Sequence, residues 1–317
     1  MEPLPEFLPL LRRSASSPGL PPSGPDALAG FRAVMNHALI KWAGQGPVLG
    51  QVTDLTIDGP YRPVPVRRYE PPGIAAPRPV IVFCHGSGFV LGNLDTHDWL
   101  ARSLADTARA VVVSVDYLLA PEHPFPAAAD ECLAVLRWVA SGGAGRTADP
   151  GRIALAGDSA GGAIVSGVSA TARDLGGPSV CAQLLMYPVC GLELDTPSWA
   201  RYGHGYFLDK PTMRWFWSQY LSKPQDAENP AAVPLAARDL REMPPTVLLT
   251  AGCDPLKDEG RSLANRLTDA GVKTRGLDVG GAIHGFMTMS AISPSAAGAV
   301  RMAASALRDL TGWKEEG

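Results

Sequence analysis

The chain is short of cysteine, and what it has follows no pattern of a binding site. It contains 5 cysteines in 317 residues, an odd number without the spacing of metal ligands. Four of the five stand in or beside apolar runs, so we expect those four to be reduced, buried thiols; the five are Cys84, Cys132, Cys181, Cys190 and Cys253. Neither a metal nor an organic cofactor is expected.

Charge of one sign and long apolar runs are also scarce. The formal net charge is -3 and no run of Lys or Arg occurs, which argues against nucleic acid or an anionic membrane surface as a partner. No apolar segment reaches the roughly 18 residues that a transmembrane helix needs. Residues 1–25 are too rich in proline for a secretory signal, so we expect a cytoplasmic protein without stable membrane association.

What the sequence does have is an alternation of strand and helix patterns. Apolar, β-branched runs lie at 52–57, 64–70, 80–84, 110–116, 153–157, 181–187, 246–251 and 273–279. The first two alternate apolar and polar residues, as antiparallel edge strands do, and the later ones are nearly continuous. Helical patterns lie at 98–109, 127–140, 160–173, 258–270 and 296–310. This order predicts an α/β fold with a mostly parallel eight-stranded sheet and helices on both faces.

Two segments fall outside the alternation. Residues 1–48 hold a Pro-rich lead and one helix at 26–42, and we treat them as separate from a main domain at 49–317. Residues 192–236 hold an aromatic helix near Trp215 and Trp217 between Pro-containing loops. The aromatic side chains either pack this helix onto the main body or line the entrance of a site as a lid.

A serine between two glycines marks the best candidate for a reactive group. The apolar run that ends at Gly157 leads into Asp158, Ser159, Ala160 and Gly161, and a helical pattern follows. Glycines flank a nucleophile elbow because the turn between strand and helix leaves no room for side chains. The pattern predicts an exposed, strained Ser159 at the positive end of a helix.

A nucleophilic serine needs a general base and a carboxylate that orients it. His284 follows the last predicted strand in a glycine-rich loop, at the carboxyl edge of the sheet, and is the predicted base. Four other histidines are interpreted as structural or surface residues: His37, His97, His123 and His204. Asp254 follows another strand and is the predicted carboxylate, with Asp258, Glu259 and Asp278 as rivals.

Donors for a developing oxyanion are expected directly after the run 80–84. There Gly86, Ser87 and Gly88 follow His85, and a loop this poor in side chains lets N–H groups approach a carbonyl. A dinucleotide-binding loop is the competing interpretation, because Gly86, Gly88 and Gly92 follow a strand. Its spacing is one residue too long, and two strands precede it.

Five motifs in this order resemble the bacterial hormone-sensitive-lipase family of esterases: His85-Gly-Ser-Gly-Phe89, Asp116-Tyr-Leu-Leu-Ala-Pro-Glu122, Gly157-Asp-Ser-Ala-Gly-Gly162, Asp254-Pro-Leu-Lys-Asp-Glu259 and His284-Gly-Phe286. The resemblance implies an α/β-hydrolase fold with a helical cap built from the N-terminal region and the 192–236 insertion. It implies a triad of Ser159, Asp254 and His284, with oxyanion donors from residues 86–88 and the N–H of Ala160. A small-molecule ester would be the substrate, and a homodimer is suggested by resemblance alone.

Two positions depart from the family pattern. Ser87 stands where the family usually has a glycine, and Leu118 stands where it usually has an arginine. Serine carboxylesterase activity on short- to medium-chain acyl esters is the main expectation. The alternatives are a dedicated deacetylase or acyl-transfer enzyme that acts on one small metabolite with the same triad, and a non-catalytic small-ligand receptor.

Overall fold

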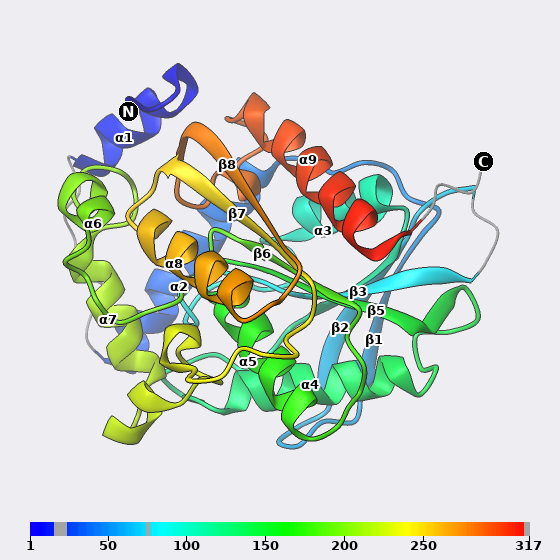
Figure 1. Cartoon of the computed structure of the whole chain (residues 1–317). Helices are drawn as coiled ribbons and strands as arrows, with labels where there is room; N and C mark the ends of the chain where they lie inside the picture. Colours follow the sequence, from blue (N-terminus) through cyan, green and yellow to red (C-terminus); the bar gives the residue numbers. More distant parts are fainter. Residues whose placement is uncertain (16–23, 74–76, 314–317) are drawn as a thin grey trace.

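The computed structural model describes residues 1–15, 24–73 and 77–313, and in these ranges eight strands form one sheet (Figure 1). The strand order is β1-β2-β4-β3-β5-β6-β7-β8. The pairs β1–β2 and β2–β4 are antiparallel, and all other neighbours are parallel. The predicted mostly parallel eight-stranded sheet is confirmed. Its strands are Gln51–Ile57 (β1), Val64–Glu70 (β2), Arg78–Cys84 (β3), Val111–Val115 (β4), Ala148–Asp158 (β5), Ala182–Met186 (β6), Thr246–Cys253 (β7) and Thr274–Ile283 (β8).

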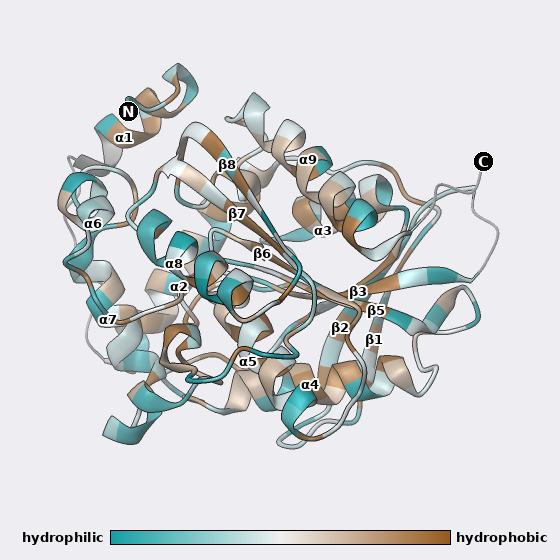
Figure 2. Cartoon of the chain, viewed as in Figure 1, coloured by the Kyte–Doolittle hydropathy of each residue, from teal (hydrophilic) through white to brown (hydrophobic). Residues whose placement is uncertain are grey.

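Helices cover both faces of the sheet. One face packs against α3 (Asp98–Ala108) and α9 (Pro294–Thr311), which bury Leu104 and Leu307 there. The other face packs against α4 (Ala127–Ala140), α5 (Ala160–Asp174) and α8 (Lys257–Asp269). Figure 2 shows the apolar strands in brown between these layers, and β3 and β4 are buried along their whole lengths. The continuous apolar runs therefore correspond to strands that helices cover on both faces of the sheet.

Four further helices lie together at one end of the sheet in Figure 1. They are α1 (Leu8–Ala15) and α2 (Pro25–Ala43) from the N-terminal segment, and α6 (Pro197–Tyr202) and α7 (Lys210–Tyr220) from the insertion after β6. Residues 1–48 were expected to hold only one helix, at 26–42, but α1 forms in the Pro-rich lead as well. It does so because Phe7 and Leu11 are buried against the main body, which local sequence does not reveal.

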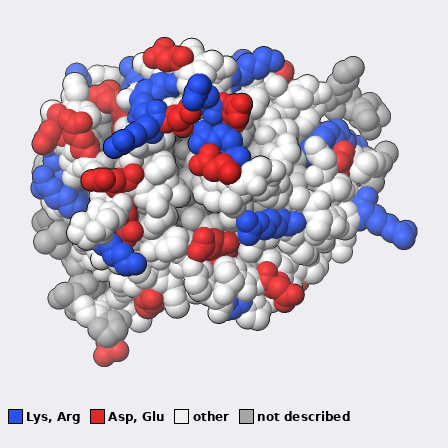
Figure 3. All heavy atoms as spheres, turned by 60° about the horizontal axis from the view of Figure 1, so that its bottom comes forward, with Lys and Arg blue, Asp and Glu red and all other residues white. Residues whose placement is uncertain are grey.

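The surface carries charges of both signs side by side. On the face in Figure 3, Lys and Arg side chains lie next to Asp and Glu, without a patch of one sign. Among the residues that the structure describes, no helix has the length and apolarity to cross a bilayer. The same residues contain no group of three or more His, Cys, Asp or Glu side chains that could hold a metal ion.

Candidate active site

Ser159 stands at the junction of β5 and α5 with a backbone conformation that side-chain-bearing residues rarely adopt. Its φ is 52° and its ψ is -119°. A Cβ on Gly157 would lie 2.3 Å from the carbonyl oxygen of Gly161, and a Cβ on Gly161 would lie 2.0 Å from the carbonyl oxygen of Cys84. Only glycine fits at both places. The turn thus has the geometry of a nucleophile elbow.

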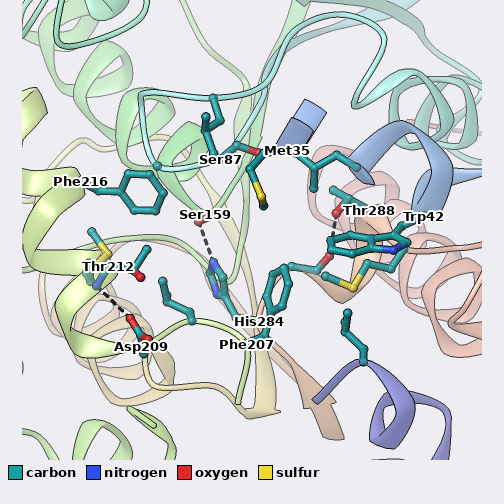
Figure 4. A pocket seen from close by; sticks show the side chains of 18 of the residues that line it. Met35, Trp42, Ser87, Ser159, Phe207, Asp209, Thr212, Phe216, His284 and Thr288 are labelled. Carbon is teal, nitrogen blue, oxygen red and sulfur yellow. Dashed lines mark hydrogen bonds between the residues drawn. The ribbon is translucent and has the colours of Figure 1, made fainter. Parts of the chain in front are cut away.

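A histidine and a carboxylate continue from Ser159 in one line of hydrogen bonds. The Ser159 Oγ lies 2.8 Å from Nε2 of His284, and Nδ1 of His284 lies 2.8 Å from Oδ2 of Asp254. All three side chains are buried, and Figure 4 shows the first contact as a dashed line. The expected exposure of Ser159 is therefore wrong, because residues of distant segments, among them Met35 and Phe216, line the cavity around it. With the Nδ1–H donated to Asp254, Nε2 is free to accept the hydroxyl proton of Ser159.

The strand before His284 is longer than predicted. Residues 280–283 were expected to form a loop, but β8 continues to Ile283, which pairs with Cys253 of β7. This pairing is the reason for the difference, since two glycines carry no strand pattern of their own. It brings His284 and Asp254, the residues that follow these two strands, next to each other.

The rival carboxylates have other partners. Asp258 Oδ2 accepts the N–H of Ser198 at 2.7 Å, and Asp278 Oδ2 pairs with Lys257 at 3.0 Å. Glu259 Oε1 accepts the N–H of Cys190 at 2.7 Å, and burial raises the pKa of Glu259 to about 8. Of the four carboxylates considered, Asp254 is the one that contacts His284.

The loop of residues 85–92 follows β3 and borders Ser159. Its residues Ser87, Gly88 and Phe89 have φ values of 81°, 68° and 66°. Ser87 and Gly88 line the same cavity as Ser159. Within the described part of the chain, the N–H groups of Ser87, Gly88 and Ala160 donate to no protein acceptor. They are available as donors to a bound molecule.

Two buried histidines at the site, His97 and His85, were given no role in the site from the sequence. His97, interpreted as structural or at the surface, is buried, lines the cavity and places Nε2 3.4 Å from Oδ1 of Asp158. The same Asp158 oxygen accepts the N–H of Gly86 at 2.9 Å. Behind the loop, burial and the neighbouring His97 lower the pKa of His85 to about 3, so that ring is neutral. No local pattern marks such contacts, because Asp158 and Gly86 stand 72 positions apart.

A cavity of about 860 Å³ opens around Ser159 and His284. In Figure 4, Phe216 and Thr212 of α7 lie on one side of this pair, and Trp42, Phe207 and Thr288 lie on the other. The rings of Trp42 and Phe207 meet edge to face at 5.9 Å. We call these sides the Phe216 compartment and the Trp42 compartment. Both are lined mainly by apolar side chains, contributed by helices α1, α2 and α7 and by loops near the strand ends.

The sequence is similar to a known protein family and to characterised proteins. A family described as having the alpha/beta hydrolase fold matches residues 81–288, which is more than half of the chain. Esterase LipI of Mycobacterium tuberculosis is 42% identical over 262 residues, covering 81% of this chain and 82% of that protein. An ethyl acetate hydrolase of Pseudomonas putida is 36% identical over 274 residues, covering 84% and 85%.

Solved structures are similar over nearly the whole length. An ester hydrolase from the metagenome of Lake Arreo, bound to a bipyridine phosphonate derivative, superposes with a TM-score of 0.92. It is 37% identical in sequence and covers 98% of this chain and 99% of its own. An esterase of the archaeon Pyrobaculum calidifontis gives a TM-score of 0.89 at 37% identity, with 98% and 99% covered.

Proposed function

The chain belongs to the α/β-hydrolase-fold family and is a carboxylic-ester hydrolase, and we propose that Ser159, His284 and Asp254 are its catalytic triad. The observation that carries this proposal is the pair of 2.8 Å contacts that joins the three side chains. The motifs resembling hormone-sensitive-lipase esterases support the same assignment, as do the esterases among its relatives.

In the acylation half of the proposed reaction, the Ser159 Oγ attacks the ester carbonyl carbon. The hydroxyl proton moves to Nε2 of His284, and Asp254 stabilises the charged imidazole that results. Backbone N–H groups of Ser87, Gly88 and Ala160 donate hydrogen bonds to the carbonyl oxygen as it becomes negative. Gly86 was also expected to donate, but its N–H is bound to the Asp158 carboxylate, so it is not one of the proposed donors. Each such donor is worth about 3 kcal/mol in the transition state. The C–O bond then breaks, and the alcohol leaves with the proton from His284.

In the deacylation half, water attacks the acyl-serine carbonyl while His284 takes its proton. The second tetrahedral intermediate collapses, the proton returns to the Ser159 Oγ, and a carboxylic acid is released. The free cysteines do not enter this chemistry. Cys253 is next to Asp254 in sequence, but burial raises its pKa, so it is a poor nucleophile.

We propose esters of short- to medium-chain acids as substrates and a cap formed by residues 1–48 and about 192–236, of which residues 16–23 lie outside the described part of the chain. The apolar lining and the volume of about 860 Å³ suit an uncharged ester with room on both sides of the carbonyl. Helices α1, α2 and α7 contribute much of that lining, which supports the cap.

The test is hydrolysis of nitrophenyl esters from acetate to laurate by the wild-type protein and Ser159→Ala. We expect turnover in the wild type, highest for the shorter chains, and a loss of about a million-fold in Ser159→Ala. Ser169→Ala is the matched control, because Ser169 is also buried on α5 but does not line the cavity. Activity of Ser159→Ala within tenfold of the wild type would mean that the wrong nucleophile is named.

We also propose a cytoplasmic location. The Sγ atoms of Cys84 and Cys132 lie 3.3 Å apart, in hydrogen-bond contact and not in a disulfide, and the other three cysteines are free thiols as well. Reduced thiols at this separation suit a reducing compartment. Subcellular fractionation of the source cells, with activity on nitrophenyl acetate as the readout, tests this.

A further inference from the structure

The 85–92 loop is held in a conformation that it would not keep by itself. Three successive residues, Ser87, Gly88 and Phe89, have positive φ values, and two of them are not glycine. Residues in this region are strained, and they persist only where surrounding contacts fix them. Since this loop carries two of the three proposed oxyanion donors, Ser87 and Gly88, the contacts that fix it bear on catalysis.

Part of the support comes from elements other than α2. The Asp158 carboxylate accepts the N–H of Gly86 at 2.9 Å, and the N–H of Ala120 donates to the carbonyl of Phe89 at 3.0 Å. The Phe89 ring stacks on Tyr220 of α7, with ring centroids 3.9 Å apart. These contacts fix the first half of the loop.

The second half of the loop is held by helix α2. Arg32 donates from Nε to the carbonyl oxygen of Val90 at 2.8 Å, and Asn36 accepts the N–H of Gly92 at 3.1 Å. Arg32 also donates to the carbonyl oxygen of Ala120 at 2.6 Å and forms two 2.6 Å contacts with the carboxylate of Glu122. One guanidinium thus joins α2, the 85–92 loop and the 120–122 segment.

Arginine is suited to this task in a way that lysine is not. Its planar fork supplies five N–H donors in fixed directions, so two carbonyls and a carboxylate can be bound at once. The Arg32 side chain is only 20% exposed, which weakens competition from water. Because Arg32 contacts Val90, three residues after Ser87, a displaced α2 would release the loop beside the proposed oxyanion donors.

We propose that Arg32 is a positioning residue that holds the 85–92 loop in the geometry that binds the oxyanion. Helix α2 then lines the substrate cavity with one set of side chains and completes the catalytic site with another. This inference rests on the proposed function, since it assigns Arg32 a role only if Ser87 and Gly88 supply oxyanion donors.

The experiment compares Arg32→Ala, Arg32→Lys and the control Lys41→Ala on nitrophenyl acetate and nitrophenyl octanoate. Lys41 is an exposed cation in the last turn of the same helix. We expect Arg32→Ala to lower kcat by about tenfold or more on both esters, with KM changed by less than about threefold. Arg32→Lys keeps the charge and should recover part of the loss, while Lys41→Ala should match the wild type.

A KM-against-kcat split separates this role from simple packing. If Arg32 only held α2 over the cavity, Arg32→Ala would raise KM, more for the octanoate than for the acetate ester. Its kcat on the acetate ester would then stay within about twofold of the wild type. That result overturns the proposal. If Arg32→Ala is unfolded at the assay temperature, Arg32→Lys is judged by the same criteria. An active Ser159→Ala in the same assay would overturn the proposed function instead.

Discussion

Asp158 connects the proposed nucleophile Ser159 to the 85–92 loop, and the proposed reaction needs both at fixed positions. Its Oδ1 accepts the N–H of Gly86 at 2.9 Å and faces Nε2 of His97 at 3.4 Å. The next residue is Ser159, so one carboxylate ties the nucleophile to the donor loop. A Cβ on Gly86 would lie 2.6 Å from Asp158 Oδ2, which explains why glycine stands there.

Asp158→Ala should therefore lower kcat strongly and lower the melting temperature only slightly. The Gly86 N–H would lose its acceptor, and a buried unpaired donor costs about 1–3 kcal/mol. We expect kcat on nitrophenyl acetate to fall by about tenfold or more, and Asp158→Asn, which keeps an acceptor oxygen, to retain more activity. Kinetics of both variants and their melting temperatures are the measurement. Equal kcat in the wild type and Asp158→Ala would show that the contact is dispensable.

Glu259 makes stability depend on pH in the opposite sense to most carboxyl groups. Burial raises its pKa from 4.5 to about 8, so the folded protein keeps a proton that the unfolded chain releases. The stabilisation from this proton is complete below pH 4.5 and is lost as the pH rises through 8.

Glu259→Gln should remove this dependence. Glutamine is uncharged at every pH, and its amide oxygen can still accept the N–H of Cys190. Between pH 6 and pH 9, the melting temperature of the wild type should fall by about 2 °C more than that of Glu259→Gln. Calorimetric scans at several pH values measure the difference, and parallel curves for the two proteins would contradict the buried protonated state.

At the scale of elements, the junction of β5 and α5 leaves room for the backbone alone. The helix begins directly after Ser159, and Gly161 lies against the carbonyl of Cys84 at the end of β3. The close approach lets one strand end carry the nucleophile while its neighbour β3 leads into the donor loop. Any Cβ at Gly161 would push these two strand ends apart.

Gly161→Ala should lower kcat by about tenfold or more and also lower the melting temperature, because the added methyl has no free space. Gly30→Ala is the matched control on the exposed side of α2, where a Cβ would meet nothing within 4 Å. Since alanine is the better helix former, Gly30→Ala should be as stable as the wild type or slightly more stable. Both variants are compared by melting temperature and by turnover of nitrophenyl acetate.

At the scale of the whole molecule, the cavity exists because chain segments far apart in sequence meet over the strand ends. The N-terminal helices provide Trp42, the insertion provides Phe207 and Phe216, and the main domain provides Ser159. The acyl and alcohol parts of an ester leave the carbonyl carbon in different directions. The Phe216 compartment and the Trp42 compartment are therefore each expected to hold one part of the substrate.

Phe216→Ala and Trp42→Ala should each change the preference for a different part of the ester. One variant is expected to extend the range of acyl chains by about two carbons or more, and the other the range of alcohols, because each removes one wall. The measurement uses nitrophenyl esters of increasing acyl length and acetates of increasing alcohol length. Val34→Ala, on the exposed face of α2, is the control. If both aromatic variants change the preference for the same part of the ester, acyl or alcohol, the two-compartment interpretation is wrong.

The sequence predicted the fold well wherever local pattern decides structure. Continuous apolar runs predicted strands that are covered on both faces, and helical patterns predicted the helices between them. Some element boundaries differ from the predicted ones. Strand β5 begins at Ala148, before the predicted 153–157, because the polar segment that precedes Ile153 pairs with β3 through Arg78. Such pairing depends on a neighbouring strand and not on the segment itself.

By itself the sequence determined the sheet, the elbow around Ser159 and the candidates at the strand ends, since spacing and residue type act over a few positions. The sequence already favoured Asp254 over the other carboxylates, and the tertiary structure supplied the contact, since Asp254 faces His284 while the rivals bind other groups. Tertiary structure alone also brought Arg32 to Val90, across 58 positions. Contacts of that range depend on how the whole chain packs, so no local pattern can specify them.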